Sequence, residues 1–324
     1  MKIGVFGTGA YGLALTSILS ENNNEVTMWT KFEEEKNLLT TTRGNDKLLT
    51  GYRLDDNVKI TTNIYECAKD KDLLIIVIPA QFVSDLCTKL SPYVDDSTKI
   101  CIASKGIEKS SGYFVSDIVK ETLNTEKIAV ISGPTFAKDI ITKKPIGLSL
   151  ATMDMGMQAT VDTVFSNDHV KLRATEDIIG VEICGAIKNV MAIAAGILDG
   201  LNATESTKAM FLTESLHDIE EIIDIFNGDK KTILSYAGFG DIILTCTSTS
   251  SRNYSFGRLV GLNDEIEIRN YLSNTTVEGY DTLAAIYKLL GHKRVNVPII
   301  DLMYKIINNE IEPQELLKFL VEKK

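Results

Sequence analysis

Three glycines near the N-terminus constrain the fold more than any other part of the sequence. They read Gly7-Thr-Gly9-Ala-Tyr-Gly12, directly after the β-rich run 3–6 and directly before an apolar helical pattern. In such a strand–turn–helix unit, the first glycine allows a tight turn and the second lets a pyrophosphate approach the backbone. The third lets the helix pack closely on the strand, so that its N-terminus faces the anion. This context predicts dinucleotide binding, with an ordinary glycine-rich turn as the alternative.

The rest of the N-terminal half alternates between strand and helix patterns. Apolar, β-branched runs lie at 3–6, 26–29, 73–78, 99–103, 128–132, 146–151 and, more briefly, 170–174. Helical patterns at 12–21, 82–90 and 113–122 separate most of these runs. Strands that are apolar throughout are typical of a sheet covered on both faces. The alternation therefore predicts an α/β fold with a Rossmann-type, doubly wound parallel sheet.

After about residue 177 the pattern becomes helical. Apolar residues recur at helical spacing in 181–198, 205–226, 282–290 and 302–307, and Pro313 opens a terminal helix that we expect to reach residue 324. We therefore expect a Rossmann-like NAD(P)-binding domain over residues 1–178 and an all-helical substrate-binding and catalytic domain over residues 179–324. No long Pro/Gly linker separates the halves, so we expect them to pack together with the ligand in the cleft.

Composition excludes several classes of function. The net charge of −10 argues against nucleic-acid binding. Uninterrupted apolar stretches such as 190–198 are too short to span a bilayer, and the start of the chain shows no signal peptide. The cysteines and histidines are scattered, without a C-x-x-C pair: Cys67, Cys87, Cys101, Cys184, Cys246, His169, His217 and His292. We expect no metal site, no disulfide framework, buried thiols and a cytoplasmic location.

The end of the second strand bears on which dinucleotide is bound. In NAD-binding folds an acidic residue at this place accepts from the ribose hydroxyls. Here the strand ends in Met28-Trp29-Thr30-Lys31, without a carboxylate, and Lys31 could face a 2′-phosphate. Glu33, Glu34 and Glu35 resemble the start of a solvated helix. We therefore expect NADP(H) to be slightly preferred, with use of NAD(H) as the alternative.

A lysine in an otherwise apolar helix is the candidate proton donor. On a helix, Gly185, Lys188, Asn189 and Ala192 share one face. A lysine among small and apolar residues is unusual, because burying an unpaired ammonium is costly. Burial would lower the pKa of Lys188 and make the amine useful in general acid–base catalysis. The alternative is a lysine that snorkels at the edge of the core.

Two loops at predicted strand ends supply candidate anion contacts. Ser104-Lys105-Gly106 follows the run 99–103, and Ser132-Gly-Pro-Thr-Phe-Ala137 follows the run 128–132. Ligands of open α/β sheets bind outside the carboxyl ends of the strands, so Lys105 is placed to meet an anionic group. An exposed loop lysine and a β-turn are the respective alternatives.

Two further stretches in the helical half carry polar residues in small-residue surroundings. Ser251 is a candidate N-cap, and Arg252 and Asn253 beside a helix N-terminus indicate an anion site. Asp241 follows Gly240 and gains a role if a cation such as Lys188 lies nearby. Simple helix capping is the alternative for both stretches.

Together these motifs resemble the bacterial-type NAD(P)-dependent sn-glycerol-3-phosphate dehydrogenase family. The matches follow family order from residue 7 to residue 280: G-T-G-A-Y-G (7–12), S-K-G (104–106), S-G-P-T-F-A (132–137), G-A-I-K-N-V (185–190), G-D-I-I-L-T-C-T (240–247), S-R-N (251–253) and V-E-G-Y (277–280). The resemblance implies reversible reduction of dihydroxyacetone phosphate to sn-glycerol 3-phosphate, the backbone of glycerophospholipids. It also implies a homodimer, although no stripe in the sequence identifies the interface.

The resemblance also implies roles for individual residues. Lys188 is expected to be the catalytic proton donor and acceptor. The expected substrate-binding residues are Lys105, Gly133, Thr135, Lys188, Asp241, Ser251, Arg252 and Asn253. The expected cofactor-binding residues are Gly7, Gly9, Ala10, Tyr11, Gly12, Lys31, Lys105, Ala137, Arg252, Thr276 and Glu278. No metal is expected.

The chain departs from the family pattern at one place, and two other functions remain as alternatives. Where relatives read T-R-G, this chain has Thr213-Glu214-Ser215, which removes an arginine and a glycine from a turn that could bind an anion. A dehydrogenase acting on 3-hydroxy acids or ketopantoate is the rival enzyme. A dinucleotide sensor without turnover is the rival from a different class.

Overall fold

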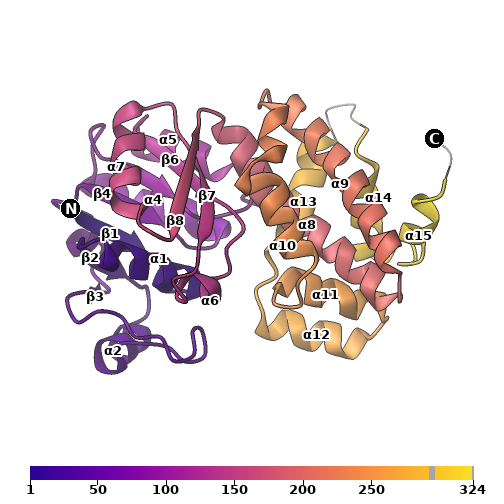
Figure 1. Ribbon diagram of the computed structural model, residues 1–324, viewed down its shortest axis with the longest axis horizontal. Coiled ribbons are helices and arrows are strands. Elements are labelled where there is room, and N and C mark those ends of the chain that lie inside the picture. Colours follow the sequence, from indigo (N-terminus) through magenta and orange to yellow (C-terminus); the bar gives the residue numbers. More distant parts are fainter. Residues whose placement is uncertain (292–295, 323–324) are drawn as a thin grey trace. The chain divides into compact units, whose positions relative to one another are not determined.

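The computed structural model describes residues 1–291 and 296–322, and its internal contacts divide the chain into two units (Figure 1). Unit 1 comprises Met1–Lys105 and Val115–Ile178, and unit 2 comprises Gly106–Phe114 and Ile179–Lys324. The expected first domain contained residues 106–114, which the contacts group with unit 2. The assignment of domains to 1–178 and 179–324 stays a prediction.

Unit 1 is built on a mostly parallel sheet. Within residues 1–178, all of which are described, eight strands lie in the order β3-β2-β1-β4-β5-β6-β7-β8. Their bounds are β1 (Lys2–Phe6), β2 (Glu25–Trp29), β3 (Lys59–Thr61), β4 (Leu73–Ile76), β5 (Ile100–Ile102), β6 (Ile128–Ser132), β7 (Ile146–Ala151) and β8 (Val170–Thr175). Strands β4 and β6 are buried along their whole length, as expected for a sheet covered on both faces. The expected Rossmann-type fold is confirmed.

Two details of the sheet differ from the expectation. Strand β7 runs antiparallel to β6, whereas we expected a fully parallel sheet. The intervening helix α6 spans only Ala137–Ile140, which is too short to carry the chain back across a face of the sheet. Strand β3 was not predicted, because its three residues are too few to show a pattern.

Helices connect most of these strands. Their bounds are α1 (Ala10–Glu21), α2 (Glu33–Thr42), α3 (Ile64–Ala68), α4 (Val83–Leu90), α5 (Val115–Leu123), α6 and α7 (Met155–Phe165), with short 3-10 turns η1 (Ala80–Phe82) and η2 (Ser91–Tyr93). The three helices predicted between strands correspond to α1, α4 and α5, although α5 begins two residues later than expected. The three glutamates after β2 form the first turn of α2, as predicted.

Unit 2 is helical, and its described residues from 179 onward contain no β-strand (Figure 1). Its elements are α8 (Ile178–Gly200), α9 (Glu205–Ile225), η3 (Lys230–Leu234), η4 (Tyr236–Gly240), α10 (Asp241–Cys246), α11 (Arg252–Gly261), α12 (Glu265–Asn274), α13 (Glu278–Leu290), α14 (Pro298–Ile307) and α15 (Glu315–Phe319). The expected terminal helix over 313–324 was too long, since α15 ends at Phe319 and residues 323–324 lie outside the described residues.

Helix α8 is the central element of this unit. By length and mean hydropathy it could cross a membrane, although Lys188 and Asn189 interrupt its apolar sequence and its uninterrupted run 190–198 is short. Other parts of the protein bury 89% of the most apolar window of this helix.

Glycines allow α8 and α11 to pack with their backbones in contact. A Cβ at Gly257 of α11 would lie 1.9 Å from the carbonyl oxygen of Ile193, and one at Gly196 of α8 would lie 2.1 Å from that of Tyr254. Neither separation is compatible with a side chain. This close approach fixes the N-terminal turn of α11 against the middle of α8.

All five cysteines are buried, as predicted from their scatter. Burial raises the pKa of the Cys246 thiol to about 12, and it also raises the pKa of Cys67 and Cys101. Because the thiolate is the reactive form, these thiols are poor nucleophiles.

Candidate active site

The glycine turn of unit 1 has the geometry that its sequence predicts. Gly7 has a φ of +130°, in a region that side chains disfavour, and a Cβ there would lie 2.6 Å from the carbonyl oxygen of Val77. A Cβ at Gly12 would lie 2.2 Å from the carbonyl oxygen of Gly7. Both positions therefore require glycine, the first for the turn and the second for the close packing of α1 on β1.

Gly9 differs from the other two glycines because it faces open space. A Cβ built on it meets no atom within 4 Å, and α1 begins at the next residue without a side-chain cap. A helix N-terminus that no side chain covers attracts an anion through its backbone N–H groups and dipole. The space in front of α1 therefore fits the pyrophosphate of a dinucleotide.

Residues from two loops gather beside the first turn of α1. The hydroxyl of Tyr11 lies 3.2 Å from the Oγ1 of Thr135. The Nζ of Lys105 lies 5.8 Å from the centre of the Tyr11 ring and donates to the carbonyl oxygen of Gly133 over 3.5 Å. The structure thus brings together residues that the sequence placed at two separate strand ends. Ala10 and Ala137 start α1 and α6, and both pack against the core of the sheet.

In unit 2, a lysine and an aspartate form a buried ion pair. The Nζ of Lys188, on α8, donates to the Oδ1 of Asp241 over 2.6 Å and to the Oγ1 of Thr245 over 3.1 Å. Lys188 is 8% exposed and Asp241 is 1% exposed. The lysine therefore does not snorkel to solvent, and Asp241 has the nearby cation on which its role depended. Removing one partner of such a pair typically costs about 3–5 kcal/mol, because it leaves an uncompensated buried charge.

The backbone before α10 places Asp241 at this position. Gly238 has a non-helical ψ of −109°, and a Cβ on it would lie 2.2 Å from the carbonyl oxygen of Ile233. The side chain of Ser235 accepts from the N–H of Gly238 and closes this turn. Thr245, one helical turn after Asp241, was not predicted as a site residue; its spacing of four residues from Asp241 is the signal that could have identified it.

A second buried network lies one residue further along α8. Asn253 donates through Nδ2 to the Oδ1 of Asn189 over 2.9 Å and accepts from the N–H of Gly279 over 2.9 Å. Asn189 also donates to the Oε2 of Glu278 over 3.4 Å. The network joins α8, α11 and α13. The helical spacing placed Asn189 on the same face as Lys188, but we did not predict Asn189 to be a site residue.

The N-terminus of α11 combines a cap, a cation and a helix dipole. Ser251 caps the helix by accepting from the N–H of Tyr254, as predicted. Arg252 is the first helical residue, its side chain is 56% exposed, and its guanidinium lies 3.8 Å from the Oε1 of Glu278. Thr276 is exposed two residues before Glu278. An exposed arginine at a capped helix N-terminus is suited to bind a phosphate.

The segment that departs from the family pattern is not a turn. Residues 213–215 lie inside α9, where Ser215 is buried and its hydroxyl donates to the carbonyl oxygen of Phe211 over 2.8 Å. The helix interior thus accommodates this serine, because its hydroxyl is satisfied locally.

An anion cradle on a Rossmann-type sheet, followed by a helical unit with a buried amine, is the arrangement of a nicotinamide-dependent dehydrogenase. Family models for the N-terminus and the C-terminus of NAD-dependent glycerol-3-phosphate dehydrogenase match residues 2–158 and 177–318. The chain is 31% identical over 325 residues to "Glycerol-3-phosphate dehydrogenase [NAD(P)+]" of Staphylococcus aureus (strain bovine RF122 / ET3-1), with 99% of this chain and 98% of the relative covered. The chain therefore belongs to the NAD-dependent glycerol-3-phosphate dehydrogenase family, and the resemblance seen in the sequence is confirmed.

Solved structures agree with this assignment. The crystal structure of the Coxiella burnetii glycerol-3-phosphate dehydrogenase matches with a TM-score of 0.93 and 26% identity over 99% of both chains. A ketopantoate reductase from Ralstonia eutropha matches with a TM-score of 0.64 and 11% identity, over 98% of this chain and 100% of the other. The second likeness shows a shared fold alone.

The open space at Gly9 leads to a prediction. Gly9 has a φ of −64°, so the Gly9→Ala variant should fold with less than about 1 kcal/mol of change in unfolding free energy. Its methyl group would occupy the space in front of α1 and weaken NADH and NADPH binding by about tenfold or more. Fluorescence titration measures both affinities.

Gly291→Ala is the matched control, because a Cβ there meets its nearest atom at an ordinary 3.4 Å. It should leave both affinities unchanged. Unchanged dinucleotide affinity in Gly9→Ala would contradict the placement of the pyrophosphate.

Proposed function

We propose that this chain catalyses the reversible, NAD(P)H-dependent reduction of dihydroxyacetone phosphate to sn-glycerol 3-phosphate. The observation that carries the proposal is the buried Lys188–Asp241 pair, linked through the adjacent residue Asn189 to the capped N-terminus of α11. An amine suited to proton transfer and a site suited to a phosphate are thereby joined in one unit. The family of the chain and the name of its Staphylococcus aureus relative support the same reaction.

Arg252, Asn253 and the N-terminus of α11 would bind the substrate phosphate. The guanidinium supplies a charge and a planar set of donors, and the helix N-terminus supplies backbone N–H groups. Asn253 is held in a fixed orientation by Asn189 and Gly279. Lys105, Gly133 and Thr135, which the family resemblance assigns to the substrate, would also contact it.

Unit 1 would hold the dinucleotide. Ala10 and Tyr11 at the start of α1, with Ala137 at the start of α6, would contact it beside the open space at Gly9. When bound, the reduced nicotinamide supplies the hydride that the carbonyl carbon of the substrate receives.

Lys188 would transfer the proton. In the reductive direction its ammonium donates a proton to the C2 oxygen, on which negative charge develops, and in the oxidative direction the neutral amine accepts the proton of the C2 hydroxyl. The bonds to Asp241 and Thr245 orient the amine. The negative charge of Asp241 compensates the ammonium, so that a charged donor is available in a buried place.

Other expectations from the sequence remain part of this proposal. The product would serve as the backbone of glycerophospholipids, and the protein would be a cytoplasmic homodimer. The substrates of the rival dehydrogenases carry carboxylates in place of a phosphate, and a sensor would bind NADPH without turnover. An assay of dihydroxyacetone phosphate and of ketopantoate, each with NADH and with NADPH, separates the three functions.

Replacing Lys188 with methionine tests the role of the amine. Lys188→Met should lower kcat by about 10²–10⁴-fold, the usual range for a general acid–base group, while NADPH binding survives. Because the variant removes the cation that compensates the charge of Asp241, the double variant with Asp241→Asn serves as its control for folding. Both variants should be inactive, and near-normal turnover in either would refute proton transfer by Lys188.

Replacing Arg252 with alanine tests phosphate recognition. Arg252→Ala should raise KM for dihydroxyacetone phosphate by about 10- to 100-fold, the loss of a charge-assisted contact, and should change KM for dihydroxyacetone little. Arg269→Ala, which removes an exposed arginine paired with Glu265 on α12, is the matched control and should change neither value. Equal effects of Arg252→Ala on both ketones would argue against a phosphate contact.

A further inference from the structure

An open pocket lies where β2 ends. It is lined by charged side chains that include Lys31, Glu33, Glu34, Glu35, Lys47 and Arg53. The strand end is joined to the glycine turn, because Trp29 accepts through its carbonyl oxygen from the N–H of Gly7 over 3.1 Å. In Rossmann-type folds the adenosine ribose of a dinucleotide lies beside this strand end. The pocket therefore occupies the place where NADH and NADPH differ, at the ribose 2′ position.

Glu35 brings a carboxylate back to this strand end from the first turn of α2. Its Oε2 accepts from the hydroxyl of Thr30 over 2.5 Å, and the same hydroxyl accepts from the N–H of Phe32. Among the described residues, the other carboxylate oxygen of Glu35 has no hydrogen-bond partner. Strand β2 ends without an acidic residue, but Glu35, five residues after Thr30, places a carboxylate beside the end of the strand.

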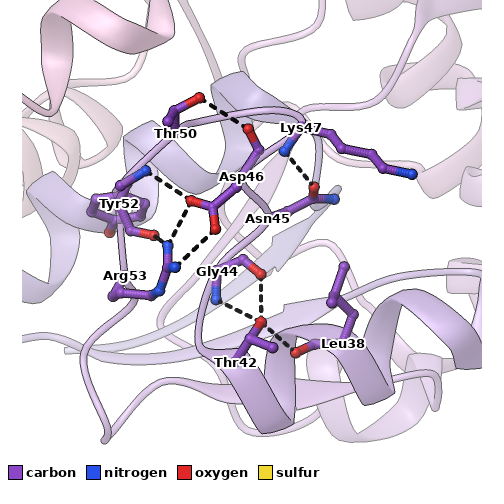
Figure 2. A network of polar contacts seen from close by, with 10 residues as sticks. Leu38, Thr42, Gly44, Asn45, Asp46, Lys47, Thr50, Tyr52 and Arg53 are labelled. Carbon is purple, nitrogen blue, oxygen red and sulfur yellow. Dashed lines mark hydrogen bonds and ion pairs between the residues drawn. The ribbon is translucent and has the colours of Figure 1, made fainter.

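The pocket lacks the excess of positive charge that would favour a phosphate. Four carboxylates line it, those of the three glutamates and Asp46, against three cations. Arg53 and Asp46 neutralise each other through two hydrogen bonds of 2.9 Å (Figure 2), which leaves the three glutamates and two lysines, Lys31 and Lys47. Glu33 is itself paired with Lys36 over 3.2 Å. A 2′-phosphate would bring about two further negative charges into this field, whereas a 2′-hydroxyl brings none.

We propose that Glu35 is the residue that determines cofactor specificity, and that it favours NADH over NADPH. Its second carboxylate oxygen would accept from the ribose 2′-hydroxyl of NADH, and its charge would repel the 2′-phosphate of NADPH. The inference rests on the proposed function, since it concerns the dinucleotide of that reaction. It opposes the NADPH preference expected from the sequence, where Glu33, Glu34 and Glu35 were interpreted as the start of a solvated helix.

A purely structural role for Glu35 gives a different expectation. Acidic residues in a first helical turn stabilise the helix dipole, and Glu35, as the third helical residue, closes a capping arrangement through Thr30. Glu35→Gln separates the two roles. Glutamine retains an oxygen that accepts from Thr30, but it has no charge to repel a phosphate.

The experiment measures the dissociation constants of NADH and NADPH for the full chain, for Glu35→Gln and for Glu34→Gln. The wild-type chain should bind NADH more tightly than NADPH. Glu35→Gln should reduce the ratio of the two constants by about tenfold, mainly through tighter binding of NADPH. Glu34→Gln is the matched control, since it removes the same charge from the same pocket, and it should change the ratio by less than about twofold.

Three results would overturn the proposal: a wild-type preference for NADPH, an unchanged ratio in Glu35→Gln, or an equal change in Glu34→Gln. Turnover of dihydroxyacetone phosphate with each dinucleotide tests the proposed reaction separately. If the chain turns over dihydroxyacetone phosphate but the ratio of the two dissociation constants is unchanged in Glu35→Gln, the role of Glu35 is refuted and the proposed reaction stands.

Discussion

The buried pair of Lys188 and Asp241 is the interaction on which the helical unit depends. An ammonium in the middle of an apolar helix is tolerated only because a carboxylate compensates it at 2.6 Å. This requirement explains the irregular backbone before α10, where Gly238 and Ser235 turn the chain so that Asp241 opens the helix. Apolar side chains of similar volume are often at least as stabilising as such a pair, which is why we assign the pair a role in the proposed proton transfer.

Anion binding by a chain with a net charge of −10 depends on local donors. The structure provides these donors at two helix N-termini, those of α1 and α11, where backbone N–H groups act at short range. Each N-terminus lies next to glycines that bring backbones close together. At α1 the glycine turn leaves space for a ligand, and at α11 the contact of Gly257 with α8 fixes the helix beside Asn189. In the proposed function, these local donors offset the repulsion that the net charge exerts on an anion.

Much of this arrangement was predictable because it depends on local sequence patterns. The glycine turn, most strands, the cap at Ser251 and the unusual setting of Lys188 each depend on a few consecutive residues. The features that were missed depend on contacts between elements. Thr245 becomes a site residue only when α10 packs on α8, and Glu35 reaches the end of β2 only through the hydroxyl of Thr30. The reversed direction of β7 follows from the short helix α6, which leaves no distinct mark on the sequence.

In the proposed reaction, the amine of Lys188 donates a proton to the C2 oxygen of the substrate or accepts one from it. A crystal structure of the full chain with NAD⁺ or NADP⁺ and sn-glycerol 3-phosphate tests it most directly. We expect the Nζ of Lys188 to lie within about 3 Å of the C2 oxygen, with the phosphate at the N-terminus of α11. A C2 oxygen bound to another side chain, with the Nζ of Lys188 out of hydrogen-bonding reach, would contradict it.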